Sequence, residues 1–198
     1  MSADASFWKK FLYSFRYRND IEGFMSGVEL RRLYGMAREM KSIVEIGSWK
    51  GRSTHALLSG CRGTVYAVDH FRGSESERET SHGEAVDGDI FAQFMKNVGM
   101  FSNLEVLKMD SEEAASKIDR VDMVFIDGDH TYPGAKRDID VWLPKAGKII
   151  CGHDYTYPEV RRAVDERFDA VEITQSLWIY DLRRGPAPST RPKGPSQR

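Results

Sequence analysis

The segment 44–54, which reads VEIGSWKGRST, constrains the fold more than any other part of this 198-residue chain. An apolar run typical of a buried strand leads into Gly47 and Gly51, and the residues that follow suit the first turn of a helix. Glycine lets the backbone approach a ligand closely, and the free N–H groups at a helix start can bind a carboxylate or a phosphate. The segment therefore predicts a strand, a glycine turn and a helix around a ligand with an anionic end.

A second apolar segment, 64–69, ends in Asp69. An acidic residue about twenty positions after such a turn can accept hydrogen bonds from both hydroxyls of a ribose. The glycines are spaced G-x-x-x-G rather than G-x-G-x-x-G, and Trp49 stands where close backbone approach to a pyrophosphate would be needed. The two strand ends therefore predict a nucleoside site and disfavour a dinucleotide. A tight turn that binds no ligand is the simpler alternative.

The first segment resembles the opening motif of class I S-adenosylmethionine-dependent methyltransferases, in particular the E-x-G-x-x-x-G-x-S form of catechol O-methyltransferase-like and macrocin O-methyltransferase-like enzymes. The resemblance implies that the turn lines the methionine end of the cofactor, that Asp69 binds its ribose, and that residues after the third strand lie on the adenine side. The cofactor contacts that it implies are Glu45, Gly47, Ser48, Gly51, Ser53, Asp69, Asp110, Ser111 and Asp127.

Composition limits the other function classes. A net charge of −1 gives no general attraction to nucleic acid or anionic membranes. The chain has no apolar run of the length that a bilayer needs and no apolar stretch typical of a signal peptide, so we expect a cytoplasmic protein. Cys61 and Cys151 are expected to be reduced structural residues rather than a disulfide pair.

Strand and helix patterns alternate along the chain, which predicts parallel strands with helices on both faces. The expected strands are 43–46, 65–69, 104–109, 123–127, 149–154, 170–173 and 177–182. A first helix is expected after the capping box at 26–29. Further helices are expected at 53–58, 90–98, 133–142 and 158–168, with a short one that begins at 112. The last two strands are too close for a crossover and should form an antiparallel hairpin. The predicted fold is therefore α/β: a doubly wound, mostly parallel seven-stranded sheet of the Rossmann-like methyltransferase type, ending in this hairpin.

Three segments lie outside the regular pattern. The aromatic and basic segment 1–20 is expected to pack on the domain at 21–182, with a substrate lid or a dimer contact as alternatives. The polar segment 72–89 is expected to be a loop at the mouth of the site that sets substrate choice. The segment 183–198 is rich in Pro, Ser and Gly and is expected to be a disordered tail.

Ionisable residues gather where the fourth and fifth strands end. Asp127, Asp129 and His130 follow one strand, and His153 and Asp154 follow the next. Ligands bind at the carboxyl ends of strands in a doubly wound sheet, so these side chains should converge on the site. Structural roles are the alternative: Asp129 can cap the following helix, and Asp154 can accept backbone N–H groups. Several buried ionisable groups together are costly without a role, which favours a functional site.

The same residues resemble the metal centre of the O-methyltransferases named above. That pattern implies a divalent cation held by Asp127, His153 and Asp154, with His153 in place of the usual first acidic residue of a pair. Mg²⁺ prefers oxygen ligands, whereas imidazole suits Mn²⁺, Fe²⁺, Co²⁺ or Zn²⁺. With a histidine among the ligands, the sequence does not determine which metal binds or whether the reaction depends on one. The resemblance also implies that His130, three residues after Asp127, is the general base; a histidine suits proton transfer near neutral pH.

The sequence therefore predicts an S-adenosylmethionine-dependent O-methyltransferase that acts on a small hydroxylated molecule, with Asp127 and His130 as catalytic residues. A non-catalytic nucleoside-binding module and, less favoured, a nicotinamide-dependent oxidoreductase are the alternatives. No basic stripe with interleaved aromatics lies beside the predicted site, so we expect neither nucleic acid nor membrane as a partner. Whether the chain forms a homo-oligomer stays open.

Overall fold

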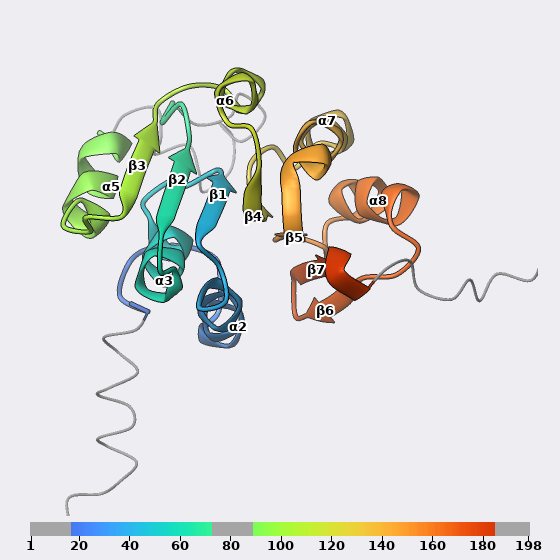
Figure 1. The fold of residues 1–198 in the computed structure, drawn as a ribbon, viewed down its shortest axis with the longest axis horizontal. Helices are drawn as coiled ribbons and strands as arrows, with labels where there is room; N and C mark the ends of the chain where they lie inside the picture. The colour runs from blue at the N-terminus through green and yellow to red at the C-terminus, as the bar shows by residue number, and fades with distance from the viewer. Residues whose placement is uncertain (1–16, 73–88, 185–198) are drawn as a thin grey trace, which may run out of the picture.

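The computed structural model describes residues 17–72 and 89–184, which fold around one sheet with helices on both faces (Figure 1). Its seven strands lie in the order β3-β2-β1-β4-β5-β7-β6. They are β1 (Ser42–Ile46), β2 (Thr64–Val68), β3 (Leu104–Leu107), β4 (Val121–Ile126), β5 (Ala146–Gly152), β6 (Glu172–Thr174) and β7 (Leu177–Asp181). The first five pair in parallel, whereas β7 pairs antiparallel with both β5 and β6. The predicted fold class, including the terminal hairpin, is confirmed.

The helices form two layers, each with its own apolar core. One layer contains α2 (Gly27–Ala37), α3 (Arg52–Gly60) and α5 (Ile90–Val98), and the other contains α6 (Ser111–Lys117), α7 (Tyr132–Trp142) and α8 (Pro158–Arg167). Figure 1 shows the two layers on opposite sides of the strands. Short 3₁₀ turns follow α7 (Leu143–Lys145) and β7 (Leu182–Arg184). The central strands are covered on both faces, which explains why they read as continuous apolar runs.

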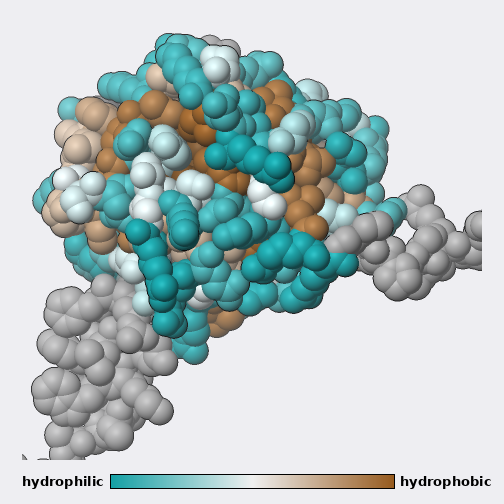
Figure 2. Space-filling model, in the orientation of Figure 1, coloured by the Kyte–Doolittle hydropathy of each residue, from teal (hydrophilic) through white to brown (hydrophobic). Residues whose placement is uncertain are grey.

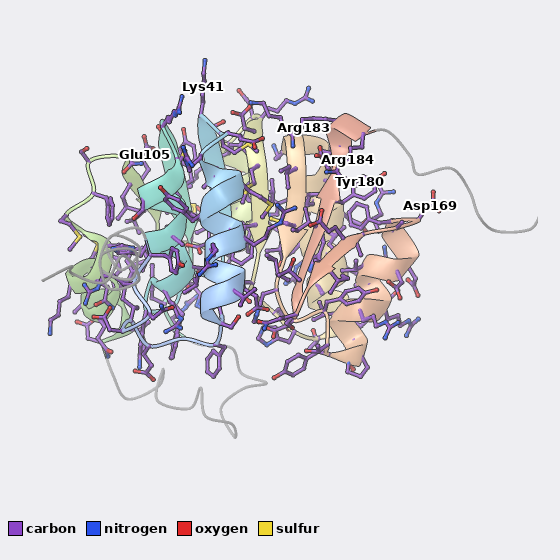
Figure 3. All side chains as sticks on the ribbon, turned by 90° about the horizontal axis from the view of Figure 1, so that it is seen from below. Lys41, Glu105, Asp169, Tyr180, Arg183 and Arg184 are labelled. Atoms are coloured by element: carbon purple, nitrogen blue, oxygen red, sulfur yellow. The ribbon has the colours of Figure 1, made fainter. Side chains whose placement is uncertain are left out.

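Strand register brings three segments together at the carboxyl ends of β1, β4 and β5. Ile46 at the end of β1 pairs with Ile126 at the end of β4, which in turn pairs with Gly152 at the end of β5. The backbone N–H of Asp127 donates to the Ile46 carbonyl at 2.7 Å, and that of His153 donates to the Ile126 carbonyl at 3.0 Å. The residues that follow these strands are therefore neighbours. Figure 3 shows Lys41, which comes just before β1, at the opposite end of the sheet, where the parallel strands begin.

Local signals account for several element boundaries. Ser26 caps α2, and Glu29 completes the predicted capping box. Thr131 caps α7, and the Asp129 carboxylate accepts the N–H of Thr131 at 2.9 Å, so the structural alternative in which Asp129 is the cap does not hold. β5 ends at Gly152, two residues before the expected boundary, since Asp154 adopts a left-handed conformation with φ +58° that an extended strand excludes.

The expected segments 1–20, 72–89 and 183–198 fall mostly outside the described residues. At their described ends, Tyr17 is buried and its hydroxyl accepts a hydrogen bond from Arg31 of α2 at 3.2 Å. Asp89 caps α5 through a hydrogen bond from the N–H of Ala92 at 2.8 Å. Arg183 pairs with Asp181 at 2.8 Å.

Three further observations concern the surface, the two cysteines and the lengths of the helices. Figure 2 shows hydrophilic residues over much of the face that it presents, with apolar residues in patches between them. Cys61 and Cys151 are buried free thiols, as expected. Among the helices within 17–72 and 89–184, none is long and apolar enough to cross a membrane.

Candidate active site

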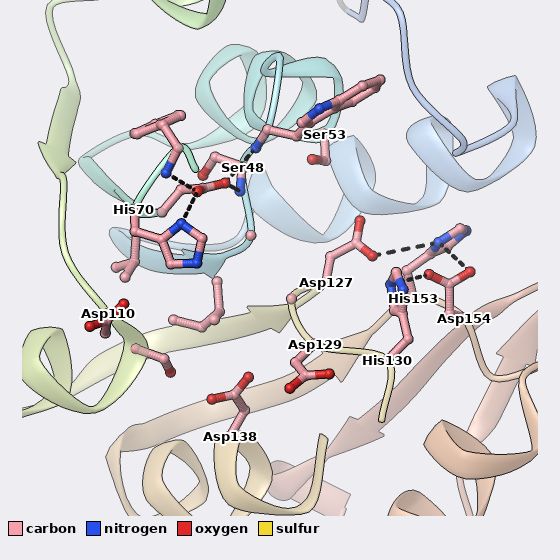
Figure 4. A pocket seen from close by; sticks show the side chains of 18 of the residues that line it. Ser48, Ser53, His70, Asp110, Asp127, Asp129, His130, Asp138, His153 and Asp154 are labelled. Carbon is pink, nitrogen blue, oxygen red and sulfur yellow. Dashed lines mark hydrogen bonds and ion pairs between the residues drawn. The ribbon is translucent and has the colours of Figure 1, made fainter. Parts of the chain in front are cut away.

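A cavity of about 1050 Å³ opens at the carboxyl ends of the parallel strands. Its walls come from the residues that follow β1, β2, β3, β4 and β5, and the lining also includes Phe24 and Tyr157. Pockets of this size suit ligands of nucleoside dimensions and larger. Figure 4 shows one group of polar side chains around the glycine turn, a second group around the ends of β4 and β5, and Asp110 and Asp138 apart from these two.

The glycine turn after β1 has an unusual backbone. Gly47, Trp49 and Gly51 have positive φ angles of 83°, 43° and 88°. A Cβ atom at Gly47 would lie 2.0 Å from the Asp127 carbonyl oxygen, so only glycine fits between β1 and the end of β4. The turn therefore packs directly on the segment that carries Asp127. Gly51 packs against α5 and does not line the cavity, whereas Gly47, Ser48 and Ser53 do.

Asp69 connects the turn to β2. One carboxylate oxygen accepts the N–H groups of Ser48 at 3.0 Å and Trp49 at 2.8 Å, and the other accepts the N–H of Phe71 at 2.6 Å. The side chain is partly exposed and lines the cavity. Asp69 therefore orders both loops at this end of the sheet and still has acceptor capacity toward a ligand.

Glu45 lies beneath the turn rather than in the cavity wall. It is fully buried, and its carboxylate accepts hydrogen bonds from the hydroxyls of Ser48, at 2.7 Å, and Thr54. Burial raises the pKa of Glu45 to about 7, against the opposing effect of its hydroxyl partners. Glu45 therefore connects Ser48 of the glycine turn to Thr54 near the start of α3.

The second group of polar side chains is an acid–imidazole cluster formed by Asp127, His153 and Asp154. Nδ1 of His153 lies 3.2 Å from a carboxylate oxygen of Asp154 and 3.7 Å from one of Asp127. One ligand-type atom from each of the three residues lies within 4.8 Å of the other two. A nitrogen and two carboxylate oxygens at such separations are a donor set suited to a transition-metal ion. The structure thus brings together the three residues that the sequence predicts as metal ligands.

His130 joins this cluster from the loop after β4. Its Nε2 lies 2.8 Å from the second carboxylate oxygen of Asp154, and its ring stacks on Tyr157 with centroids 5.5 Å apart. Asp154 therefore contacts both imidazoles, one with each oxygen. The alternative in which Asp154 accepts backbone N–H groups is not what the described contacts show.

A carboxylate that sequence reasoning missed supports the cluster from behind. Glu29 of α2 is 3% exposed, and one of its oxygens lies 3.3 Å from Nε2 of His153 while accepting the N–H of Ser176 at 2.8 Å. Its other oxygen accepts the N–H of Ser26 at 2.8 Å in the capping box. The same side chain thus starts α2, fixes the link between β6 and β7, and faces the back of the imidazole.

These contacts shift the ionisation of the cluster. Burial raises the pKa of Asp127 to about 6, although the neighbouring His153 opposes the shift. Burial alone would lower the pKa of His153, but Asp127, Asp154 and Glu29 outweigh it and raise that pKa to about 9. Burial would raise the pKa of Asp154, but hydrogen bonds from His130 and His153 hold it well below its usual range. Divergent pKa values within one cavity are typical of functional sites.

The residues after β3 form the third part of the cavity wall. Asp110 is 66% exposed and lies 3.5 Å from Arg72, and the Ser111 hydroxyl accepts a hydrogen bond from the Trp142 indole at 2.9 Å. Beside them lies Asp138 of α7, a buried carboxylate that sequence reasoning also missed. The signal was present, because Asp138 shares the apolar stripe of α7 with Ala135 and Trp142.

Comparisons with known proteins agree with this geometry. Residues 44–155, more than half of the chain, match the family model described as "Methyltransferase domain". The fold is similar to that of a methyltransferase from Geobacter sulfurreducens (TM-score 0.58, 14% identity, covering 91% of this chain and 90% of that one). It is also similar to an O-methyltransferase from Bacillus cereus in complex with S-adenosylhomocysteine (TM-score 0.57, 16% identity, 90% of each chain). A third similar structure is TomG from Streptomyces achromogenes in complex with S-adenosylmethionine (TM-score 0.54, 16% identity, 90% and 89%).

The matched region begins within β1 and ends just after Asp154, so it contains the glycine turn, Asp69 and the acid–imidazole cluster. It therefore covers both groups of polar side chains in the cavity. These findings favour an enzyme over a non-catalytic binding module or a nicotinamide-dependent oxidoreductase. The chain belongs to the methyltransferase domain family and has the class I S-adenosylmethionine-dependent methyltransferase fold.

Proposed function

We propose that this protein transfers the methyl group of S-adenosylmethionine to a hydroxyl oxygen of a small molecule bound in the cavity. The observation that carries the proposal is that the glycine turn with Asp69 and the acid–imidazole cluster with His130 open into the same cavity. The first group suits the nucleoside and amino-acid parts of the cofactor, and the second suits activation of an acceptor. Asp127, at the end of β4, lies between them and against Gly47.

The residues of the glycine turn fit the cofactor on three counts. The cavity is large enough for a nucleoside with an amino-acid chain. Gly47 brings bare backbone to the cavity wall, and Ser53 lies in the first turn of α3, where N–H groups favour a carboxylate. Asp69 offers carboxylate oxygens at the wall for the ribose hydroxyls. S-adenosylmethionine supplies an electrophilic methyl group on a sulfonium.

We expect Asp69→Ala to weaken S-adenosylhomocysteine binding by roughly 1–3 kcal/mol, because the ribose hydroxyls and the N–H groups of Ser48 and Trp49 lose a common acceptor. Isothermal titration calorimetry measures the change. Asp119→Ala, at an exposed position outside the lining of the cavity, is the matched control and should leave the affinity unchanged. Unchanged affinity in Asp69→Ala would refute the assignment of Asp69 to the ribose.

The acid–imidazole cluster fits a divalent cation. Asp127, His153 and Asp154 supply one nitrogen and two carboxylate oxygens, and Glu29 behind His153 resembles the carboxylate that commonly orients a ligating histidine. Bound there, a divalent cation would orient an acceptor hydroxyl and make its proton more acidic. The mixed donor set favours Mn²⁺, Fe²⁺ or Co²⁺ at least as well as Mg²⁺.

We expect a chelator to abolish methyl transfer while leaving S-adenosylhomocysteine binding intact, because the cluster faces the acceptor and not the nucleoside. Activity is measured with labelled S-adenosylmethionine, and binding by calorimetry, both in excess EDTA. Added Mn²⁺, Fe²⁺ or Co²⁺ should restore activity at least as well as Mg²⁺. Full turnover in excess chelator would remove the metal from the mechanism.

The chain's own residues then account for the proton. Nε2 of His130 faces Asp154, which leaves Nδ1 as the ring nitrogen that can accept a proton from the acceptor hydroxyl. The freed oxygen electron pair forms the new C–O bond to the methyl carbon. The C–S bond breaks, its electron pair returns to sulfur, and the products are a methyl ether and S-adenosylhomocysteine. Positioning of the oxygen in line with carbon and sulfur contributes the rest of the rate.

The proposal is tested by incubating the protein with methyl-labelled S-adenosylmethionine and a panel of catechols, phenols, aliphatic alcohols and primary amines. Mass spectrometry then locates the added methyl group. We expect O-methylated products from at least one hydroxylated class. Methylation confined to the amines would contradict an oxygen acceptor while leaving methyl transfer itself in place.

A further inference from the structure

Asp138 is a buried carboxylate in the wall of the cavity. Its side chain is 2% exposed, and its neighbours on the same face of α7 are Ala135, Ile139 and Trp142. Burying an ionisable group among apolar residues is costly unless hydrogen bonds satisfy it. Figure 4 shows the Asp138 carboxylate pointing from α7 toward the space near Asp110 and Asp129.

A short relay satisfies only part of this carboxylate. The Trp142 indole N–H donates to the Ser111 hydroxyl oxygen at 2.9 Å, and the Ser111 hydroxyl hydrogen-bonds to Asp138. An indole N–H can only donate and a serine hydroxyl has one proton, so the relay runs in one direction and ends on Asp138. The carboxylate oxygen Oδ1 is buried, and no donor among the residues that the structure describes reaches it.

Asp138 also lines the cavity, and its position in the fold limits which ligand group its carboxylate can meet. Asp138 adjoins Ser111, after β3, and Gly128, after β4, where a Cβ would lie 3.4 Å from its Oδ2. In the proposed binding mode the amino-acid part lies after β1 and the ribose after β2. The remaining hydrogen-bond donor of the cofactor is the exocyclic amino group of adenine.

We propose that Asp138 accepts a hydrogen bond from the 6-amino group of the cofactor's adenine and thereby selects a 6-aminopurine over a 6-oxopurine. This inference rests on the proposed placement of S-adenosylmethionine in the cavity. Asp110, which the resemblance places on the adenine side, is exposed and faces Arg72, so it cannot exclude the wrong base as a buried acceptor can.

The chemistry of selection follows from the acceptor. Burial raises the pKa of Asp138 to about 6, so at pH 7.5 its carboxylate has only acceptor atoms. A 6-oxopurine would place its carbonyl oxygen against that carboxylate, leaving two acceptors without a proton between them. Asparagine at position 138 would offer an N–H donor to that carbonyl oxygen and would lose the preference.

The test is calorimetric titration at pH 7.5 with S-adenosylhomocysteine and with S-inosylhomocysteine, its 6-oxo analogue. We expect the wild-type protein to bind the adenine compound at least about tenfold more tightly. Asp138→Asn should weaken that binding about tenfold and bring the ratio of the two affinities close to one. The matched control is Asp140→Asn, on the same helix but 46% exposed and paired with Lys136, and it should keep both affinities.

The outcomes separate this inference from the proposed function. If wild-type protein binds neither compound, the placement of the cofactor fails. If it binds both equally well, the role of Asp138 as a base reader is overturned, and this result does not depend on the folding of any variant. Retention of the wild-type ratio in a folded Asp138→Asn protein would overturn it as well.

Discussion

Replacement of His130 by alanine is expected to lower kcat by about 10²–10⁴-fold, with little change in S-adenosylhomocysteine affinity. The imidazole lies 2.8 Å from Asp154 at the cavity wall and would take the proton of the acceptor hydroxyl. The measurement is the rate of methyl transfer, across a range of pH, to the hydroxylated acceptor that the panel identifies. Wild-type activity should fall as pH decreases, because a protonated imidazole cannot accept a proton, and the alanine variant should lack this limb.

His130→Gln is the matched control for this prediction. The glutamine amide can keep the hydrogen bond to Asp154 but cannot take up a proton, so it should be as impaired as alanine. Near-normal turnover in the glutamine variant, with an unchanged pH profile, would show that His130 only positions Asp154.

Gly47→Ala is expected to destabilise the protein by roughly 2–6 kcal/mol and to abolish S-adenosylhomocysteine binding. The backbone at this position has φ +83°, which costs a residue with a Cβ about 1–3 kcal/mol. The added Cβ would lie 2.0 Å from the Asp127 carbonyl oxygen, and overpacking of this kind costs about 1–3 kcal/mol more. Urea unfolding measures the loss. The added Cβ would point into the backbone after β4.

Gly35→Ala is the matched control. Gly35 lies on α2 with open space around its missing side chain, so alanine there should stabilise the helix by about 0.5–1 kcal/mol. An alanine at position 47 that leaves both stability and cofactor binding unchanged would contradict the structural account of the turn.

Local patterns were sufficient to predict the fold. The alternation of apolar runs and amphipathic segments gave the order of elements, and the short link between 173 and 177 gave the antiparallel hairpin. The positions of Asp127, His153 and Asp154 just after parallel strands predicted their convergence, because register at the sheet edge follows from topology. Strand ends were predicted less well. β3 stops at Leu107, where the N–H of Met109 turns back to the Leu107 carbonyl at 2.9 Å, and β5 stops at Gly152, before the left-handed Asp154.

The missed residues depend on packing between distant elements. Glu29 reads as a helix-capping residue, and its contact with His153 arises only when α2 packs beside the end of β5. Asp138 stands on an apolar stripe, but its hydrogen-bond partner Ser111 comes from α6. Glu45 carries a signature of cofactor binding, yet the strand alternation places it under the turn. Motifs thus identified the site, whereas its supporting contacts required the three-dimensional structure.

A crystal structure of the protein with S-adenosylhomocysteine and Mn²⁺ tests the central proposal most directly. We predict the homocysteine part at the glycine turn, the ribose hydroxyls on Asp69 and an anomalous manganese peak between Asp127, His153 and Asp154. S-adenosylhomocysteine bound away from the glycine turn, or manganese bound away from this cluster while the cofactor is in place, would contradict the account.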